Sequence, residues 1–325
     1  MTYGLGPSVG SYQLGRKSPD RTRPNVLLKR VRGATLSPPA ATDWGTSAMN
    51  TMAMNDQLGC CTISDKVHVV TSQQYFGQGR TVVIPDTEVL KAYRAVSGYV
   101  PGKPRTDVGA TLQDAFDYAR KVGFSDGSVT HRIEAFAQID AISNRGAIDH
   151  DLIKTCIDSF GHVAVGMVFP DFAMDQFGNN QVWDWSSRVR YREEGGHDIP
   201  LVGYGGTGAG AYYDCWTWGR RQRITVPFFE RFFEEFWTSG EKDWQRLDGS
   251  VPNGIDGQAA QVEFERLIGE GPGWDGAPPA PDPDPVPEPV PGPDGPEPPP
   301  IDDQLVEAFE SFSGVFSAWR GVHGK

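Results

Sequence analysis

The residues best able to do chemistry lie in the stretch MNDQLGCCTISD, which places Cys60 and Cys61 behind a glycine and before an apolar run. A cysteine attacks a carbonyl carbon only as a thiolate, so a nucleophilic cysteine needs a lowered pKa. The start of a helix stabilises an anion through its free N–H groups and its dipole. We predict that a helix begins at this pair, with Cys61 in its first turn and Cys60 facing elsewhere. Cys61 is therefore the candidate nucleophile; the alternative is that both are ordinary core residues, because unpaired cysteine is among the most buried residue types.

A thiol nucleophile also needs a proton acceptor, and His197 is the best placed of the six histidines. It follows two glycines and opens the apolar run IPLVGYG, so a strand would hold its imidazole at one end. His68 lies about 10 Å along the helix axis from Cys61, which is too far to share a proton. The other histidines have no such flanking pattern: His131, His150, His162 and His323. The alternative for His197 is a structural histidine at the end of a strand.

The elements that must position these two side chains change in character along the chain. Apolar periodicity predicts helices in the first half, over residues 62–76, 86–96 and 110–124. Strand-like runs follow at 162–169, 197–205 and 211–219, and a returning helix is predicted at 227–237. Helices first and antiparallel strands later indicate an α+β fold of two lobes.

Both ends of the chain differ from this globular part, which we expect to span residues 41–275. Residues 1–40 form a basic arm rich in Gly, Pro, Ser and Arg; we expect it to be solvated, with a nucleic-acid or partner contact as the alternative. Residues 276–300 alternate proline with acidic residues, which predicts an extended polyproline II linker. Residues 301–325 carry apolar side chains at spacings of three and four, which predicts an amphipathic helix. We favour docking of that helix on a protein partner, or self-association, because a long stiff linker separates it from its own domain.

The composition excludes several classes of function. The net charge of −12 opposes general nucleic-acid binding, so we expect no such partner except through the basic arm. Only four cysteines occur, two of them adjacent and none in CxxC spacing, so we expect free thiols, no disulfide framework, no metal site and no cofactor. No apolar run reaches the length of a signal peptide or a membrane span, so we expect no signal peptide and no membrane contact.

The motifs, taken in order over residues 38–245, resemble those of the papain-like cysteine peptidases, and in particular the short bacterial and phage members that lack a long propeptide. NDQLGCCT is similar to the nucleophile motif N-D-x-x-G-D-C-T, and GGHDIPLVGYG to the signature G-H-A-V-x-x-V-G-Y. CWTWG resembles the closing N-S-W-G, and PPAATDWG resembles the opening P-x-x-x-D-W. The runs ATLQDAFDYARKVGF, DLIKTCIDSFGHVAVGMVFPDF and ITVPFFERFFEEFW match as well. The resemblance implies a papain-like α+β fold with a helical lobe, an antiparallel β lobe and an active-site cleft between them.

The resemblance also implies a role for each motif residue. Cys61 would be the nucleophile, and His197 the base and acid of a catalytic dyad. The oxyanion would be held by the Cys61 amide and by the side chain of Asn55, with Gln57 as the alternative donor if the loop is shorter. Trp218 would shield the site from water. The substrate cleft would be lined by Gly59, Cys60, Gly196 and Trp218.

Two positions depart from the family pattern. The Asn that orients the imidazole aligns with Trp216, whose indole cannot accept a hydrogen bond. Either the dyad works alone, or a carboxylate such as Glu235 or Asp214 takes that role. Asp198 replaces the small residue after the histidine, and strand alternation predicts that it turns to the opposite face. A missing orienting group lowers the rate more than it abolishes the chemistry.

Two functions therefore stay open. The first is a cysteine peptidase: a phage-associated thiol hydrolase that cleaves peptide or isopeptide bonds in a peptide or protein substrate, cell-wall peptide included. The second is a catalytically impaired papain-fold protein, a structural or attachment component of a virion or assembly that is docked by residues 301–325. The altered Asn position, the arm and the tail favour the second function. Asn55, Cys61 and His197 favour the first, which is the leading hypothesis, and for either we expect a cytoplasmic or virion-associated protein.

Overall fold

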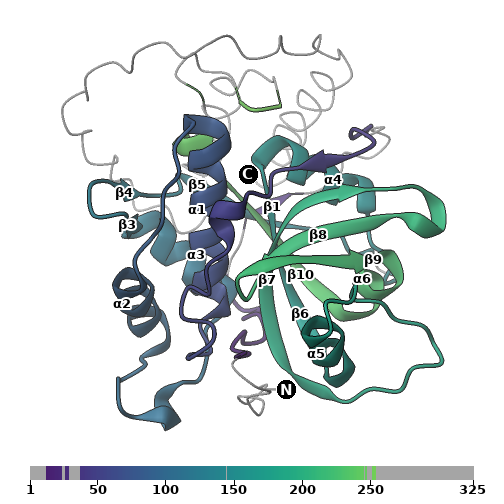
Figure 1. Ribbon diagram of the computed structural model, residues 1–325, viewed down its shortest axis with the longest axis horizontal. Helices are drawn as coiled ribbons and strands as arrows, with labels where there is room; N and C mark the ends of the chain where they lie inside the picture. Colours follow the sequence, from purple (N-terminus) through teal and green to yellow (C-terminus); the bar gives the residue numbers. More distant parts are fainter. Residues whose placement is uncertain are drawn as a thin grey trace, which may run out of the picture.

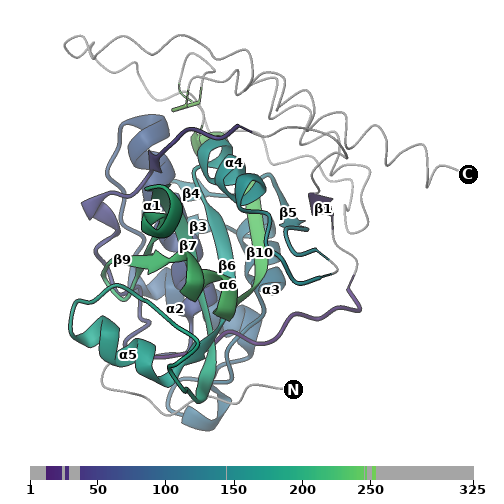
Figure 2. The same ribbon diagram turned by 90° about the vertical axis from the view of Figure 1, so that its right-hand side faces the viewer.

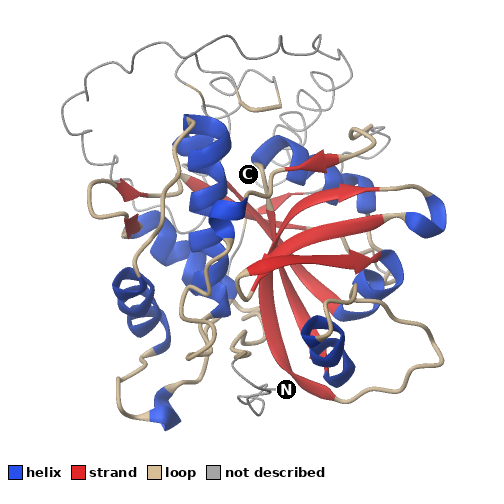
Figure 3. Ribbon diagram, in the orientation of Figure 1, coloured by secondary structure: helices blue, strands red, loops and turns tan. Residues whose placement is uncertain are grey.

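The computed structural model describes residues 12–23, 26–28, 37–143, 145–244, 246 and 251–253. The linker and amphipathic helix predicted for 276–325 lie outside these residues, as does the start of the basic arm. In the described chain a group of helices faces a long, twisted, mostly antiparallel sheet (Figure 1, Figure 3). Within this part of the chain, none of the helices has both the length and the apolar composition needed to cross a bilayer.

The helical lobe is built around one buried helix. Its helices are α1 (Cys61–Gln78), α2 (Asp86–Ser97) and α3 (Leu112–Lys121). All but three of the 18 residues of α1 are buried, so this helix is covered on every side and not only along one stripe. It ends at Gly79, whose φ of 62° suits glycine after a helix. α3 begins after Thr111, whose hydroxyl accepts a hydrogen bond from the Asp114 amide at 3.1 Å. Local end signals therefore place the helices close to where the sequence predicts them.

The second lobe is an eight-stranded sheet in the order β1-β5-β10-β6-β7-β8-β9, with β2 paired to β7. All pairs are antiparallel except β1 with β5. The strands are β1 (Leu27–Leu28), β2 (Thr42–Asp43), β5 (Ala135–Ile139), β6 (Val163–Pro170), β7 (Glu193–Gly205), β8 (Tyr212–Thr217), β9 (Arg220–Thr225) and β10 (Phe233–Gly240). The helices of this lobe are α4 (His150–Phe160), α5 (Asp171–Gly178) and α6 (Val226–Phe232). A separate small hairpin, formed by β3 (Phe124–Ser125) and β4 (Thr130–His131), follows α3.

Each lobe has its own apolar core. The larger core gathers residues of the sheet and of α4, α5 and α6, among them Phe169, Trp183 and Phe228. The smaller core lies among α1, α2 and α3, and Ala164 of β6 and Trp237 of β10 join it from the sheet. Because α1 packs on β7, the start of α1 and the middle of β7 meet at the boundary between the two cores.

The α+β two-lobe fold predicted from the sequence is confirmed, but the returning helix predicted at 227–237 is wrong in its second half. The chain is helical only to Phe232, and β10 begins at Phe233. From there the residues pair with β6, where Phe233 lies opposite Met167, and then also with β5. Pairing on both edges outweighs the helical spacing of the aromatic residues, because strand preference depends on cross-strand neighbours.

The basic arm is not solvated over the part that the structure describes. Residues 12–23 run against the domain, and Arg16 is only 1% exposed. Figure 2 shows the N-terminal segment, in purple, crossing the molecule on its way to β1. Its backbone hydrogen-bonds to Gly196 of β7 and to Ala110 ahead of α3. The prediction of a solvated arm is therefore wrong for residues 12–19, because backbone pairing with both lobes holds them in place, whereas residues 20–22 are exposed.

Candidate active site

The two adjacent cysteines face different parts of the molecule. α1 begins at Cys61, with Cys60 as the preceding cap residue. Cys60 packs into the core of the helical lobe, where its sulfur bonds to the Ala53 carbonyl at 3.5 Å. The Cys61 sulfur lies at the boundary of the lobes, near the backbone amides of Asp198 and Gly15, which act to lower its pKa. Of the two cysteines, Cys61 is the one that meets the sheet lobe.

The Cys61 thiol is neutral in this arrangement. Burial raises its pKa to about 12, and the nearby Asp198 carboxyl acts in the same direction. The two backbone amides and the Arg16 guanidinium oppose this shift without outweighing it. The start of α1 therefore does not by itself produce a thiolate here, because the sulfur is cut off from water.

Asp198 lies on the face of β7 that meets α1, whereas its neighbour His197 packs on Trp218, as strand alternation predicts. Burial raises the pKa of Asp198 well above its ordinary value, and the Asp65 carboxylate adds to the effect. Lys66 and the more distant arm arginine act in the opposite direction. The negative charge that would oppose a thiolate at this place is therefore itself disfavoured.

His197 is fully buried on β7, opposite Met167 of β6. Its ring stacks on the indole of Trp218, with centroids 4.3 Å apart and planes at 12°. Nε2 lies 2.8 Å from the Thr217 hydroxyl, whereas Nδ1 is buried and has no hydrogen-bond partner among the described residues. Burial lowers the pKa of the ring to about 3, so the imidazole is neutral. The ring is thus fixed through one nitrogen, and the other makes no hydrogen bond to the Cys61 sulfur or to any other described residue.

Thr217 is the group that orients this ring, and sequence reasoning missed it. The position aligned with the family's Asn is Trp216, whose indole donates instead to the Asn50 side chain at 2.9 Å. Adjacent residues of a strand face opposite sides, so Thr217, one position later on β8, reaches His197. A hydroxyl oxygen accepts a hydrogen bond as an amide oxygen would. Alternation along CWTWG was the signal that could have found it.

Neither carboxylate considered for that orienting role bonds to His197. Glu235 accepts hydrogen bonds from Arg16 and from the Trp237 indole. Asp214 pairs with an arginine of β9 at 2.9 Å. The hypothesis that Glu235 or Asp214 replaces the missing Asn is therefore wrong, since both carboxylates are used elsewhere.

Asn55 is buried upstream of Cys61, and its amide reaches a carbonyl of the arm. Nδ2 donates to the Gln13 carbonyl and to the Leu58 carbonyl, at 3.1 Å each. Gln57, the alternative oxyanion donor, has an exposed side chain. Of the two amides, Asn55 is the one that bonds to the arm.

The arm covers the Cys61 sulfur. The Gly15 amide, which lies near the sulfur, donates to the Gly196 carbonyl at 3.1 Å, and the Gly15 carbonyl accepts from the Ala110 amide at 3.0 Å. A Cβ at Gly15 would lie 1.8 Å from the Gly59 carbonyl oxygen, so only glycine fits at this position. The arm therefore runs between the backbone of Gly59 in the helical lobe and that of Gly196 in the sheet lobe, and Gly15 lies over the Cys61 thiol.

Four residues are predicted to line the substrate cleft: Gly59, Cys60, Gly196 and Trp218. The two glycines contact the backbone of the arm, and Trp218 packs on Tyr12 with ring centroids 5.2 Å apart. Cys60 differs, because it is turned into the core of the helical lobe. The arm thus occupies the track along which a peptide would meet these residues.

No protein-family model matches the chain, and no curated protein matches it in sequence. Among solved structures it is similar to xylellain, a cysteine protease from Xylella fastidiosa, with a TM-score of 0.51 and 12% identity over 76% of this chain and 98% of that one. It is also similar to digestive procathepsin L2 proteinase from the larval midgut of Tenebrio molitor, with a TM-score of 0.49 and 16% identity over 74% of this chain and 84% of that one. The likeness to xylellain identifies the architecture. The chain has the two-lobe papain-like fold, and the fold predicted from its motifs is confirmed.

Proposed function

We propose that this chain of papain-like fold is a thiol hydrolase that cleaves peptide or isopeptide bonds, with Cys61 as nucleophile and His197 as general base and acid. The state of the His197 ring carries the proposal. Thr217 holds Nε2, and Nδ1 is left unpaired in a buried site, next to the residue whose amide touches the Cys61 sulfur. A buried ring nitrogen without a partner calls for an explanation, and proton exchange with the thiol supplies one.

The role requires the tautomer with the proton on Nε2, which the Thr217 hydroxyl oxygen can accept. The lone pair of the ring is then on Nδ1. The proton of the Cys61 thiol then passes to Nδ1, which gives a thiolate and an imidazolium. The thiolate is stabilised by the start of α1, and the stacked Trp218 indole keeps water from the His197–Thr217 hydrogen bond.

The thiolate then attacks the carbonyl carbon of the bond to be cleaved. Negative charge develops on the carbonyl oxygen, where the Asn55 side-chain amide and the Cys61 backbone N–H donate. His197 gives its proton to the leaving amine, and the acyl group stays on sulfur as a thioester. A water molecule deprotonated by His197 hydrolyses the thioester and restores the thiol.

The arrangement with the arm in place is a covered form of the enzyme. The Gly15 amide lies on the sulfur and pairs with Gly196, so a substrate reaches Cys61 only after the arm moves. Departure of the arm returns water to the sulfur and removes the main cause of its raised pKa. We therefore expect the thiolate–imidazolium pair to form in the uncovered state.

The second hypothesis, an impaired enzyme, depended on the arm, the tail and tryptophan at the orienting position. Thr217 supplies the hydrogen-bond acceptor that Trp216 lacks, which removes that reason. Other expectations stay predictions from the sequence: phage association, cell-wall peptide as substrate, docking through residues 301–325, and a cytoplasmic or virion location.

Alkylation of the cysteines tests the proposal. The full chain and an Arg16→Ala variant, in which the arm is less firmly held, are treated with iodoacetamide or with an epoxide inhibitor of papain-type enzymes, and the modified peptides are mapped. We expect rapid modification confined to Cys61 in the variant, and its loss when His197→Ala is added. Slow and equal modification of all four free cysteines would contradict the proposal.

A further inference from the structure

We propose that Glu234 and Glu235 form a subsite that selects an arginine side chain of the substrate, and that Arg16 occupies this subsite in the covered form. The proposal rests on the proposed hydrolase function and adds the substrate class of the same site.

Arg16 is bound as a ligand is bound. Its fully buried side chain makes five hydrogen bonds, as many as a guanidinium has N–H groups. Glu235 Oε2 accepts from Nε at 3.1 Å and from Nη2 at 2.8 Å. Glu234 Oε1 accepts from both Nη atoms at 3.0 Å each, and the Met167 carbonyl accepts from Nη1 at 3.3 Å. Acceptors placed on both sides of the group fit the planar, forked donors of a guanidinium. They fit a lysine ammonium less well, because its three donors sit on one atom.

The pocket around the Arg16 guanidinium is shaped by residues of the domain. The Trp237 indole donates to Glu235 Oε1 at 2.9 Å, which fixes the carboxylate and leaves Oε2 for a guanidinium. A Cβ at Gly166 of β6 would lie 2.2 Å from Arg16 Nε, and one at Gly196 would lie 2.3 Å from the Arg16 carbonyl oxygen. The two glycines therefore provide the room for an arginine side chain and its backbone.

The occupant of the pocket must carry a positive charge. The side chain of Glu235 is only 1% exposed while Arg16 is in place, so an uncharged side chain that filled the pocket instead would leave a buried carboxylate without a cation. A guanidinium from a substrate would restore the same hydrogen bonds. A leucine side chain of similar size would leave the carboxylate unpaired, and this difference is the source of the expected selectivity.

The pocket adjoins the proposed catalytic residues. The Arg16 amide donates to the Gly196 carbonyl at 2.9 Å, and Gly196 directly precedes His197. Gly15, the preceding residue of the arm, has its amide on the Cys61 sulfur. A peptide that follows the same track therefore places the side chain of a residue close to the cleaved bond in the pocket.

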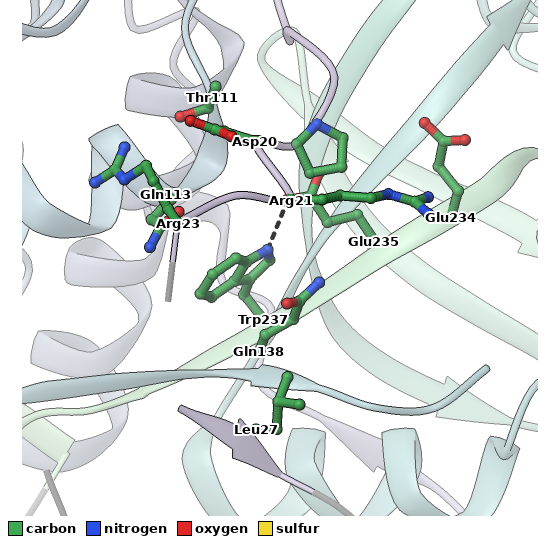
Figure 4. A pocket seen from close by; sticks show the side chains of 11 residues that line it. Asp20, Arg21, Arg23, Leu27, Thr111, Gln113, Gln138, Glu234, Glu235 and Trp237 are labelled. Carbon is green, nitrogen blue, oxygen red and sulfur yellow. Dashed lines mark hydrogen bonds between the residues drawn. The ribbon is translucent and has the colours of Figure 1, made fainter. Parts of the chain in front are cut away.

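A cavity of 380 Å³ extends beyond the acidic pair. Figure 4 shows it between β10 and the arm, and its lining includes Glu234, Glu235, Trp237, Asp20, Arg21 and Arg23. Because the arm forms part of the wall, its departure opens this side of the cavity. The acidic pair then becomes accessible to a substrate peptide that extends more than two or three residues from the bond at the Cys61 sulfur.

Hydrolysis of matched peptides tests the subsite. The enzyme is the full chain with Arg16→Ala, and the probes are acyl-dipeptidyl aminocoumarins with Arg, Lys or Leu at either residue before the coumarin. We expect kcat/KM for the best arginine peptide to exceed that of its leucine counterpart at least about tenfold, with lysine between them. Adding Glu235→Gln should lower the rate for arginine far more than for leucine and reduce the ratio to less than about threefold. Glu230→Gln changes a glutamate of α6 that is paired with His150; it is the matched control and should leave the ratio unchanged.

Each other outcome has a definite meaning. Glu234 has a side chain that is 38% exposed, so Glu234→Gln provides a second variant if Glu235→Gln impairs folding, and it should lower the ratio in the same direction. Equal rates for the three peptides, or an arginine preference that survives both substitutions, would overturn the subsite and leave the hydrolase function standing. Failure to hydrolyse any peptide, together with unselective labelling of the cysteines, would overturn the hydrolase function and the subsite with it.

Discussion

The catalytic centre and the acidic pocket are covered by neighbouring residues of the same arm, yet they are stabilised in opposite ways. At the centre, burial keeps the Cys61 thiol and the His197 ring uncharged, and Gly15 covers the thiol with backbone alone. In the pocket, Arg16 forms ion pairs with two glutamates, and each N–H of the guanidinium has an acceptor. The difference shows that shielding and holding are separate tasks of the arm. A substitution in one region should therefore leave the other largely intact.

The largest expected effect is the difference between substitutions of the two adjacent cysteines. In the Arg16→Ala background, Cys61→Ser should lower kcat at least about 10⁴-fold, because a serine hydroxyl is a poor substitute for the thiol in a thiolate–imidazolium pair. Cys60→Ser should keep kcat within about threefold, since a hydroxyl can make the same bond to the Ala53 carbonyl. Hydrolysis of an aminocoumarin peptide measures both. A similar loss in both variants would show that Cys61 has no special role.

Arg16→Ala removes the guanidinium from the acidic pocket and should change the catalytic centre only by uncovering it. Removing one partner of a buried ion pair costs about 3–5 kcal/mol, so the covered form should lose more than about a hundredfold in population. Because burial raises the pKa of Cys61 to about 12, alkylation of Cys61 in the wild-type chain should rise about tenfold per pH unit up to pH ~10. In the variant the sulfur meets water, its pKa falls, and the rate should level off at a lower pH. The measurement is the labelling rate of Cys61 between pH 6 and 10.

Arg23→Ala is the matched control for that prediction. Arg23 is another arginine of the arm, paired with Asp114 and Asp117 while its side chain is 32% exposed. Surface pairs of this kind contribute about 0–1 kcal/mol each, so loss of both should change the labelling rate by less than about thirtyfold, against more than about a hundredfold for Arg16→Ala. If the two substitutions released the arm equally, its basic charge and not the pocket would hold it.

Thr217→Val affects the centre and should leave the pocket unchanged. Valine has the shape of threonine and cannot accept the hydrogen bond from His197 Nε2, so the ring loses its fixed tautomer and direction. We expect kcat to fall about 10²-fold, while the arginine-to-leucine ratio of the subsite stays the same. Thr217→Ser keeps the hydroxyl and should recover most of the rate. An unchanged kcat in the valine variant would mean that the ring is held by its stacking on Trp218 alone.

The sequence predicted the fold and the candidate pair because the motifs for both are local. A cysteine after a glycine at a helix start, and a histidine ahead of VGYG, are recognised from their neighbours, although their catalytic roles stay predictions. Arg16 could not be placed in this way, because its partner Glu235 lies 219 residues along the chain. The start of β10 at Phe233 depends equally on distant pairing, with β5 and β6. Thr217 was missed for another reason. It is adjacent to Trp216 in the sequence, and the two differ only in which face of β8 their side chains occupy.

That last distinction gives the smallest expected effect. Trp216→Phe removes the indole N–H that bonds to Asn50 and keeps an aromatic ring against Met49. One such hydrogen bond is worth about 1 kcal/mol, so Tm should fall by about 2–4 °C. If Thr217 positions the imidazole, kcat should change less than about twofold, because the residue aligned with the family's Asn has no contact with the ring to lose. A loss of kcat as large as that of Thr217→Val would mean instead that the aligned position governs the ring from the other face of β8, through the packing of the strand and not through a hydrogen bond.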